Sequence, residues 1–366
     1  MHRNLDGVKH SPHSQGPSSS VAEETMNGNV GVAIGLVLLG GFLQGSFALP
    51  MKRMGRWRWE NTWLVYSMAG MLLLPWIMVF TTVPRFTEVL AEARGLTIVE
   101  VVIFGFCWGV GSTLFGLGIT RVGMALTFAI VLGITASLGS LLPLVVLHPE
   151  QLFTRQGYAL IFGLIIVILG IMVCSLAGHR RERELSSQSA QRGGADFWLG
   201  LVICIFSGVF SAMLNFSFVF GKDLQDASRA AGASPAMSSN LIWALALSAG
   251  FVANAGYCIY LLQRNRTWGV LREKDISRSY WLGAVLMGAV WFFGIAFYGM
   301  GATGLGTLGA VLGWPVFMAM NITAANVWGV LTGEWRGASR RTYSISWAGI
   351  LILLIAIYII SRASTL

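Results

Sequence analysis

Ten long apolar segments constrain this chain more than any other feature of its sequence. Of its 366 residues, 55% are hydrophobic and 11% are charged, whereas about a quarter of a soluble domain is charged. Each segment is near the roughly 20 residues that a helix needs to cross a bilayer core. The segments lie at about residues 30–50, 62–83, 98–119, 122–147, 157–178, 197–220, 237–262, 280–301, 303–331 and 344–362. The sequence therefore predicts an all-α integral membrane protein with ten transmembrane helices.

A pattern in the third segment returns in the eighth, 183 residues later. Trp108 matches Trp291, Thr120 matches Thr303, and Tyr298 stands where the first copy has a phenylalanine. The glycines at 105, 111, 116, 118 and 123 recur as those at 288, 294, 299, 301 and 306. Such repetition is typical of transporters built from two related halves. Five segments per half is an odd number, so we expect two inverted five-helix repeats, residues 30–178 and 197–362.

Very short loops follow the third and eighth segments, at 120–123 and 302–306, and the other loops predict the orientation. Of the 25 lysine and arginine residues, 17 lie in the odd-numbered loops. The positive-inside rule places those loops in the cytoplasm and both termini outside. The same rule accounts for the net charge of +9, which therefore gives no indication of nucleic-acid binding. A cytoplasmic linker is expected at 179–196, and a disordered polar tail at 1–29.

Tryptophans near segment ends are typical of the aromatic belt at the membrane surface. The members of this predicted belt are Trp57, Trp59, Trp63, Trp76, Trp198, Trp281, Trp335 and Trp347. The four cysteines all fall within apolar segments and have no metal-ligand spacing, so we interpret them as small buried hydrophobic residues. No metal site is predicted.

Several motifs in both halves resemble one known family. They are Lys52-x4-Trp57-x-Trp59-Glu60-x2-Trp63, Leu74-Pro75-Trp76, Trp108-Gly109-Val110-Gly111, Gly116-Leu117, Arg121-x-Gly123-Met124, Gly133-Ile134, Trp314, and Glu334-Trp335-x2-Ala338-x-Arg340-Arg341. With these motifs, residues 30–362 resemble the bacterial L-rhamnose–proton symporters of the drug/metabolite transporter superfamily. The resemblance implies two inverted five-helix halves around a cavity that opens alternately to each side of the bacterial cytoplasmic membrane. It also implies import of a neutral deoxyhexose such as L-rhamnose by proton symport, without a cofactor.

The sequence departs from this family at one functional position. Family members carry an acidic residue early in the ninth segment, where this chain has Ala310. All 16 carboxylates lie in tails, loops or segment ends, so Glu60 and Glu334, close to the membrane, are the candidates for proton coupling. Sodium coupling and uncoupled passage stay open.

Neutral polar and aromatic side chains within the segments are the candidates for sugar binding. Amides bond to sugar hydroxyls, and the apolar face of a sugar ring lies on an aromatic ring. The candidates are Trp108, Trp291, Trp314, Trp243, Tyr298, Gln44, Asn215, Asn240, Asn254 and Asn321. For each of them, packing or hydrogen bonding between helices is the alternative interpretation.

Two other classes of function stay open at this point. The first is export of drugs or metabolites on the same scaffold. The second is a membrane enzyme or a sugar sensor without transport. An enzyme needs paired acid and base groups in a cleft, and the sequence has no such pair within its segments. We therefore predict a transporter of a small sugar, embedded in lipid, rather than an enzyme.

Overall fold

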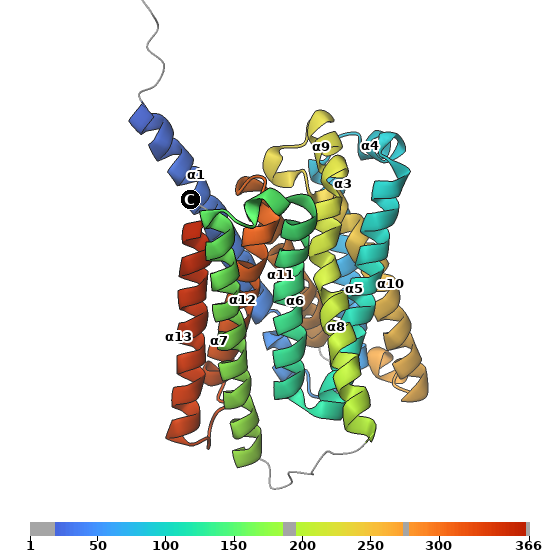
Figure 1. The fold of residues 1–366 in the computed structure, drawn as a ribbon. Helices are drawn as coiled ribbons and strands as arrows, with labels where there is room; N and C mark the ends of the chain where they lie inside the picture. Colours follow the sequence, from blue (N-terminus) through green and yellow to red (C-terminus); the bar gives the residue numbers. More distant parts are fainter. Residues whose placement is uncertain (1–18, 186–194, 274–277, 364–366) are drawn as a thin grey trace, which may run out of the picture.

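The computed structural model of the chain is a bundle of long helices (Figure 1). It describes residues 19–185, 195–273 and 278–363, and no strand occurs among them. Ten helical segments in this part of the chain are long and apolar enough to cross a membrane. They are Val30–Arg53, Trp59–Thr82, Gly95–Val122, Leu126–Leu147, Arg155–Leu185, Phe197–Ala230, Pro235–Arg264, Arg278–Gly304, Gly309–Leu331 and Arg340–Ala363. The predicted all-α membrane fold with ten spans is confirmed.

Helices dominate because a chain in lipid must satisfy every backbone N–H and C=O internally. The α-helices are α1 Ser19–Ser46, α2 Trp59–Ser67, α3 Leu74–Thr82, α4 Phe86–Glu92, α5 Gly95–Val122, α6 Met124–Leu147, α7 Arg155–Leu185, α8 Ala195–Phe220, α9 Lys222–Ala230, α10 Asn240–Arg264, α11 Arg278–Gly304, α12 Gly309–Leu331 and α13 Arg340–Ala363. A π-helical stretch, η2 Met68–Leu73, joins α2 to α3 within one span. Pro75 follows it and has no backbone N–H to donate, which explains the local break in the α-helical hydrogen bonds.

The two tight turns that the repeat predicts have the same backbone signature. Gly123, between α5 and α6, has a φ of 93°, and Gly306, between α11 and α12, has a φ of 78°. Positive φ is strained for residues with a side chain. Each turn therefore depends on its glycine, and the two glycines are partners in the sequence repeat.

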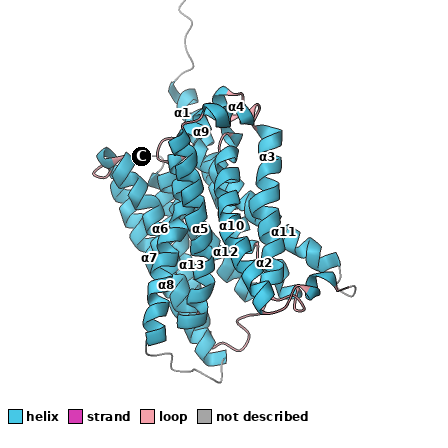
Figure 2. Cartoon of the chain, turned by 90° about the vertical axis from the view of Figure 1, so that its right-hand side faces the viewer, coloured by secondary structure: helices cyan, strands magenta, loops and turns pink. Residues whose placement is uncertain are grey.

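The long helices pack in a regular pattern of neighbours. Helix α1 packs against α11 and α12, while α8 packs against α5 and α6. Helix α7 lies along α13, and α6 also contacts α12. Figure 2 shows the same bundle from the side, with the short helices α4 and α9 together at one end.

The two ends of the bundle need names for the argument that follows. We call the end at which α1 begins and α13 ends the termini end. The opposite end, at which α7 ends and α8 begins, is the linker end (Figure 1). The tight turn between α5 and α6 lies at the linker end, and the turn between α11 and α12 lies at the termini end.

Three expectations need correction or restriction. Helix α1 begins at Ser19, so residues 19–29 are helical rather than a disordered tail, and 1–18 lie outside the described residues. Helix α7 runs on to Leu185, so 179–185 continues a helix instead of starting a linker. The rest of the expected linker up to residue 194 is outside the described residues.

The predicted aromatic belt is wrong for four of its tryptophans. Trp57 and Trp335 are buried, at 5% and 2% exposure. Trp63 and Trp76 point inward and donate hydrogen bonds to side chains of α10. Segment ends in this protein are covered by loops and neighbouring helices, so position in the sequence alone did not place these rings at lipid. Trp198 and Trp347, which are well exposed, suit the predicted belt.

Candidate functional site

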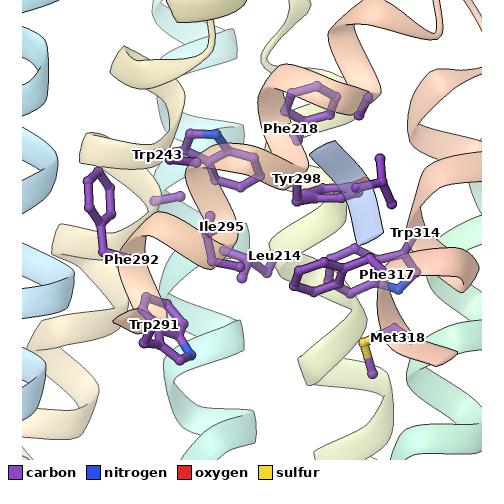
Figure 3. Close-up of a cluster of buried hydrophobic side chains, with 14 of the residues drawn as sticks. Leu214, Phe218, Trp243, Trp291, Phe292, Ile295, Tyr298, Trp314, Phe317 and Met318 are labelled. Carbon is purple, nitrogen blue, oxygen red and sulfur yellow. The ribbon is translucent and has the colours of Figure 1, made fainter. Parts of the chain in front are cut away.

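A buried layer of aromatic and amide side chains lies across the bundle between α6, α8, α11 and α12. Trp314 of α12 stacks on Phe317 with ring centroids 5.6 Å apart, and Tyr298 of α11 meets Trp314 edge to face at 5.4 Å (Figure 3). Asn215 of α8 completes the layer and is fully buried. Three sequence-predicted candidates thus meet at one place.

Hydrogen bonds tie this layer to α6. The indole N–H of Trp314 donates to the carbonyl oxygen of Thr135 at 3.0 Å. The amide nitrogen of Asn215 donates to the carbonyl oxygen of Gly139 at 2.8 Å, and its oxygen accepts from the hydroxyl of Tyr298. Trp314 can approach α6 so closely because position 139 is glycine: a Cβ there would lie 2.2 Å from the indole nitrogen. We call Thr135, Gly139, Asn215, Tyr298 and Trp314 the central layer.

A cavity of about 330 Å³ opens at the linker end, between α1, α6, α7 and α12. Its walls are mostly apolar, with Met124, Phe128 and Leu132 of α6 facing Ile322 and Ala325 of α12. A volume of this size is at the lower end of the range for small-molecule sites. The linker-end cavity therefore has room for a small ligand such as one sugar.

Charged side chains gather at this cavity. Glu334 forms ion pairs with Lys52, at the end of the first span, and with Arg181 of α7, the latter at 3.2 Å. Arg181 also lies over the ring of Trp335, 5.2 Å from its centre. Burial raises the pKa of Glu334, but the hydrogen bond and charge of Lys52 and the charge of Arg181 outweigh it and hold the pKa below the ordinary value. The carboxyl is therefore ionised at neutral pH and joins three separate elements.

A second cavity, of about 470 Å³, opens at the termini end between α6, α8, α9 and the turn before α12. Its polar lining residues are His148, Lys222, Gln225, Arg229, Thr303 and Thr307. Ala310, where the resembling family has an acid, also lines this cavity, and no carboxylate is among its lining residues. Asp226 pairs with both Lys222 and Arg229 along α9, at 3.6 and 3.7 Å, which balances part of the positive charge.

The central layer separates the two cavities. On α6, the linker-end cavity reaches Leu132 and the termini-end cavity begins at Pro143. Trp314 and Asn215 attach to α6 at Thr135 and Gly139, between those two limits. A ligand in either cavity is thus kept from the other by one buried, hydrogen-bonded layer.

A second cluster pairs the two tryptophans that the repeat relates. The rings of Trp108 and Trp291 stack on each other, with centroids 5.4 Å apart and an interplanar angle of 27°. Gln44 of α1 lies against Trp291: its amide oxygen accepts from the indole N–H at 2.5 Å when oriented to satisfy both groups. These three candidates meet, as packing partners of one another rather than as lining of either cavity.

Asn254 joins this second cluster through the backbone of α10. Its nitrogen donates to the carbonyl oxygen of Gly250 at 3.0 Å, and its oxygen accepts from Trp63 and from the hydroxyl of Ser112. Trp108 packs on Gly250. Each hydrogen-bonding group of the buried Asn254 amide is thus in use, which favours the structural interpretation.

The remaining candidates lie apart. Asn240 ties α10 to α3 by a bond of 2.8 Å to Thr82, and the side chain of Asn321 makes no hydrogen bond with the described residues. Glu60 accepts from Asn265 and Thr267 at 2.9 and 3.0 Å and lines neither cavity. Of the two coupling candidates, the structure therefore brings only Glu334 to a cavity.

The sequence reasoning missed several participants. Lys52 and Arg181, the ion-pair partners of Glu334, have no sequence signal for that role beyond their positive charge. Thr135 and Gly139 enter the central layer through their backbone, for which a sequence gives no signal. Phe218, which lines the termini-end cavity and stacks on Trp243 at 5.3 Å, is one phenylalanine among 21.

Comparison with known proteins finds curated relatives that match most of this chain. The curated L-rhamnose-proton symporter of Klebsiella pneumoniae subsp. pneumoniae is 25% identical over 341 residues, covering 92% of this chain and 98% of the relative. Those of Cronobacter sakazakii and Escherichia coli are 25% and 24% identical and cover 88% of this chain and 94% and 95% of their own. A solved crystal structure covers 89% of this chain at 14% identity with a TM-score of 0.49, a likeness too low to carry an argument.

The family match extends over nearly the whole chain. The model of the family described as L-rhamnose-proton symport protein matches residues 26–364. This range includes all ten spans, both cavities and the central layer. The chain therefore belongs to the L-rhamnose-proton symport protein family.

Proposed function

We propose that this protein carries L-rhamnose together with a proton across the bacterial inner membrane by alternating access. The observation that carries the proposal is a pair of cavities at opposite ends of the bundle, closed off from each other by one thin layer, in a member of this family. A carrier must expose its site to one side at a time. Residues of α6 and α12 line both cavities. Movement of the central layer would therefore connect a bound sugar to one cavity while it closes off the other.

The proposal includes an inverted-repeat relation between the halves. Met124 and Phe128 line the linker-end cavity, and the residues 183 positions later, Thr307 and Val311, line the termini-end cavity. The contacts between helices follow the same relation, in which α1, α5 and α6 of the first half correspond to α8, α11 and α12 of the second. The contact of α1 with α11 corresponds to that of α8 with α5, and the contact of α1 with α12 corresponds to that of α8 with α6. Trp108 stacks on Trp291, its partner in the repeat, as expected if a pseudo-two-fold axis that relates the two halves passes between these rings.

A neutral sugar suits the interior better than a charged metabolite. The central layer is aromatic rings, an amide and backbone carbonyls, with no ionisable carboxylate or amine among its members. Burying a charge beside such groups costs far more than burying hydroxyls that find partners. The positive-inside rule assigns the linker end, with its arginines, to the cytoplasm.

Proton coupling in this proposal runs through Glu334. In the present conformation Lys52 and Arg181 hold the pKa of Glu334 below its ordinary value, which keeps the carboxyl unprotonated. Movement of α1 or α7 away from α12 would remove those charges and let the pKa rise. The protonation state of Glu334 is then linked to whether Lys52 and Arg181 lie against it at the linker end.

Uptake of radiolabelled L-rhamnose by the purified protein in liposomes tests the function. We expect accumulation against a sugar gradient when the outside is acidified, and equilibration only when the pH gradient is removed. A sodium gradient in place of the pH gradient separates the two couplings. Absence of L-rhamnose uptake under every gradient contradicts the proposal, whereas sodium-driven accumulation contradicts only the proton.

Replacement of Glu334 tests the coupling within the same assay. We expect Glu334→Gln to retain L-rhamnose exchange between the two sides while losing acid-driven accumulation. Glu60→Gln is the matched control, because Glu60 is the other membrane-edge carboxylate and lines neither cavity. If Glu60→Gln loses acid-driven accumulation and Glu334→Gln accumulates L-rhamnose as the wild type does, proton coupling runs through Glu60 instead.

A further inference from the structure

Behind the termini-end cavity, two buried hydrogen-bond donors have no partner in the part of the chain that the structure describes. We propose that Trp243 and Ser239 form a sugar subsite that the ring of Phe218 covers in this conformation. The inference rests on the proposed function and adds to it a place where the sugar is held. It concerns residues that lie outside the central layer and behind one wall of the termini-end cavity.

The first argument is the unmet hydrogen-bonding capacity of these two side chains. The indole N–H of Trp243 and the hydroxyl of Ser239 are buried without a partner among the described residues. Trp243 is 0% exposed and Ser239 is 1% exposed. Buried polar groups in folded proteins are nearly always paired, since an orphaned group costs the full penalty of its lost hydration.

The second argument is that the two donors lie together. Ser239 is the N-cap residue of α10 and Trp243 lies one turn later, and both face Gly299 of α11: a Cβ on Gly299 would be 2.5 Å from the indole nitrogen and 2.9 Å from the hydroxyl oxygen. Only a residue without a side chain fits at position 299, so the facing helix offers no side-chain acceptor to either donor.

The third argument is the position of Phe218. Its ring stacks on Trp243 with an interplanar angle of 13° and a centroid distance of 5.3 Å (Figure 3). Phe218 also lines the termini-end cavity and is 8% exposed. It is therefore the side chain that stands between the open cavity and the face of the buried indole.

These features match the needs of a neutral sugar. The ring C–H face of a deoxyhexose can occupy the indole face that Phe218 now covers, because aromatic rings attract such apolar surfaces. One hydroxyl oxygen of the sugar can accept from Trp243 and another from Ser239. Rotation of Phe218 about its side-chain bonds thus frees the indole face for the sugar ring, and hydroxyls at the edge of the sugar that extends toward Gly299 reach the two donors.

Binding of L-rhamnose to the purified protein, measured by calorimetry, tests the subsite. We expect Trp243→Phe and Ser239→Ala each to weaken binding about fivefold, the effect of one lost hydrogen bond. Trp57→Phe and Ser346→Ala are matched controls, since they remove equally buried, equally unpaired donors elsewhere. These controls should bind as the wild type does.

The outcomes distinguish this inference from the proposed function. Wild-type binding with unchanged affinity in both Trp243→Phe and Ser239→Ala overturns the subsite and leaves symport intact. No L-rhamnose binding or uptake by the wild type overturns both. Weakening by the control variants to the same extent also overturns the subsite, because the effect is then general.

The role of Phe218 has an independent readout. A cysteine introduced as Ser239→Cys, in a protein whose native cysteines are replaced by alanine, should resist maleimide added from the termini side. Combination with Phe218→Ala should make it reactive, since the cover is removed. If the cysteine stays unreactive in the double variant, Phe218 is not the cover. The measurement needs only that the protein inserts, which labelling of Thr307→Cys at the exposed cavity wall verifies.

Discussion

Two regions of the bundle, the linker-end ion pairs and the central layer, are held together by different physical means. At the linker end, half-exposed ion pairs of Glu334 with Lys52 and Arg181 join three elements across the cavity. Between the two cavities, the barrier is a buried layer of rings and hydrogen bonds with almost no exposure. Exposed ion pairs are worth little and are screened by salt, whereas buried hydrogen bonds are costly to break. The comparison indicates an end that opens easily and responds to pH and salt, and a layer that responds to neither.

The largest effect is expected from damage to the central layer. Gly139→Ala places a methyl group where the Trp314 indole now lies, so the ring must shift and lose its bond to Thr135. We expect the free energy of unfolding to fall by about 2–4 kcal/mol, with loss of L-rhamnose uptake. Thermal unfolding in detergent measures the change. Gly133→Ala on the same helix is the control, because its methyl group meets no neighbour. Equal stability of the two variants would contradict the claim that the contact of Trp314 with α6 stabilises the central layer.

The next largest effect concerns the linker-end closure. Cys174 lines that cavity and is 7% exposed. With the other cysteines replaced by alanine, Glu334→Gln should speed maleimide labelling of Cys174 roughly five- to tenfold, because the ion pairs that join the walls of this cavity are lost. Glu182→Gln is the control, since Glu182 lines the same cavity but has no ion pair with the described residues. Identical labelling of the two variants would show that the ion pairs do not close this end.

A smaller effect is expected in the pH dependence of stability. The pKa of Glu334 lies below its ordinary value of 4.5 in the folded protein, so the ionised form stabilises the fold above that pH. The stabilisation is lost as pH falls through the lowered pKa. The melting temperature of the wild type should therefore exceed that of Glu334→Gln at pH 7, and the difference should shrink below pH 4.5. A difference that grows on acidification would reverse the sign of the proposed interaction.

The smallest effect is that of salt. Raising ionic strength from about 0.05 to 0.5 M shortens the screening length severalfold and should speed labelling of Cys174 by about twofold. Labelling of Thr307→Cys at the termini-end cavity should change less, because the ion pairs of Asp226 there lie within α9 and join no separate elements. A salt response of equal size at both positions would remove the distinction between the two ends.

The fold was largely predictable because lipid leaves few choices. Length and apolarity determined ten spans, and the repeated Gly123 and Gly306 marked two turns that both need positive φ. The repeat also related Trp108 to Trp291, although not that the two rings would stack on each other. That contact depends on where the halves meet, which no single-chain pattern reveals.

The site was predictable only in part. Asn215, Tyr298 and Trp314 were candidates, and the structure brings them together, yet their partners at Thr135 and Gly139 are backbone carbonyls that carry no residue signature. Glu60 and Glu334 were equivalent by sequence, because both are carboxylates at span ends. Only the packing of Lys52 and Arg181 around one cavity separates them.

The central claim is that the two cavities open in alternation around one layer. Its most direct test follows maleimide labelling of Cys174 and of Thr307→Cys, each in a protein without other cysteines, while the L-rhamnose gradient across the membrane is reversed. The account predicts that reversal accelerates labelling at one position and slows it at the other. Labelling that changes in the same direction at both positions, or at neither, would contradict it.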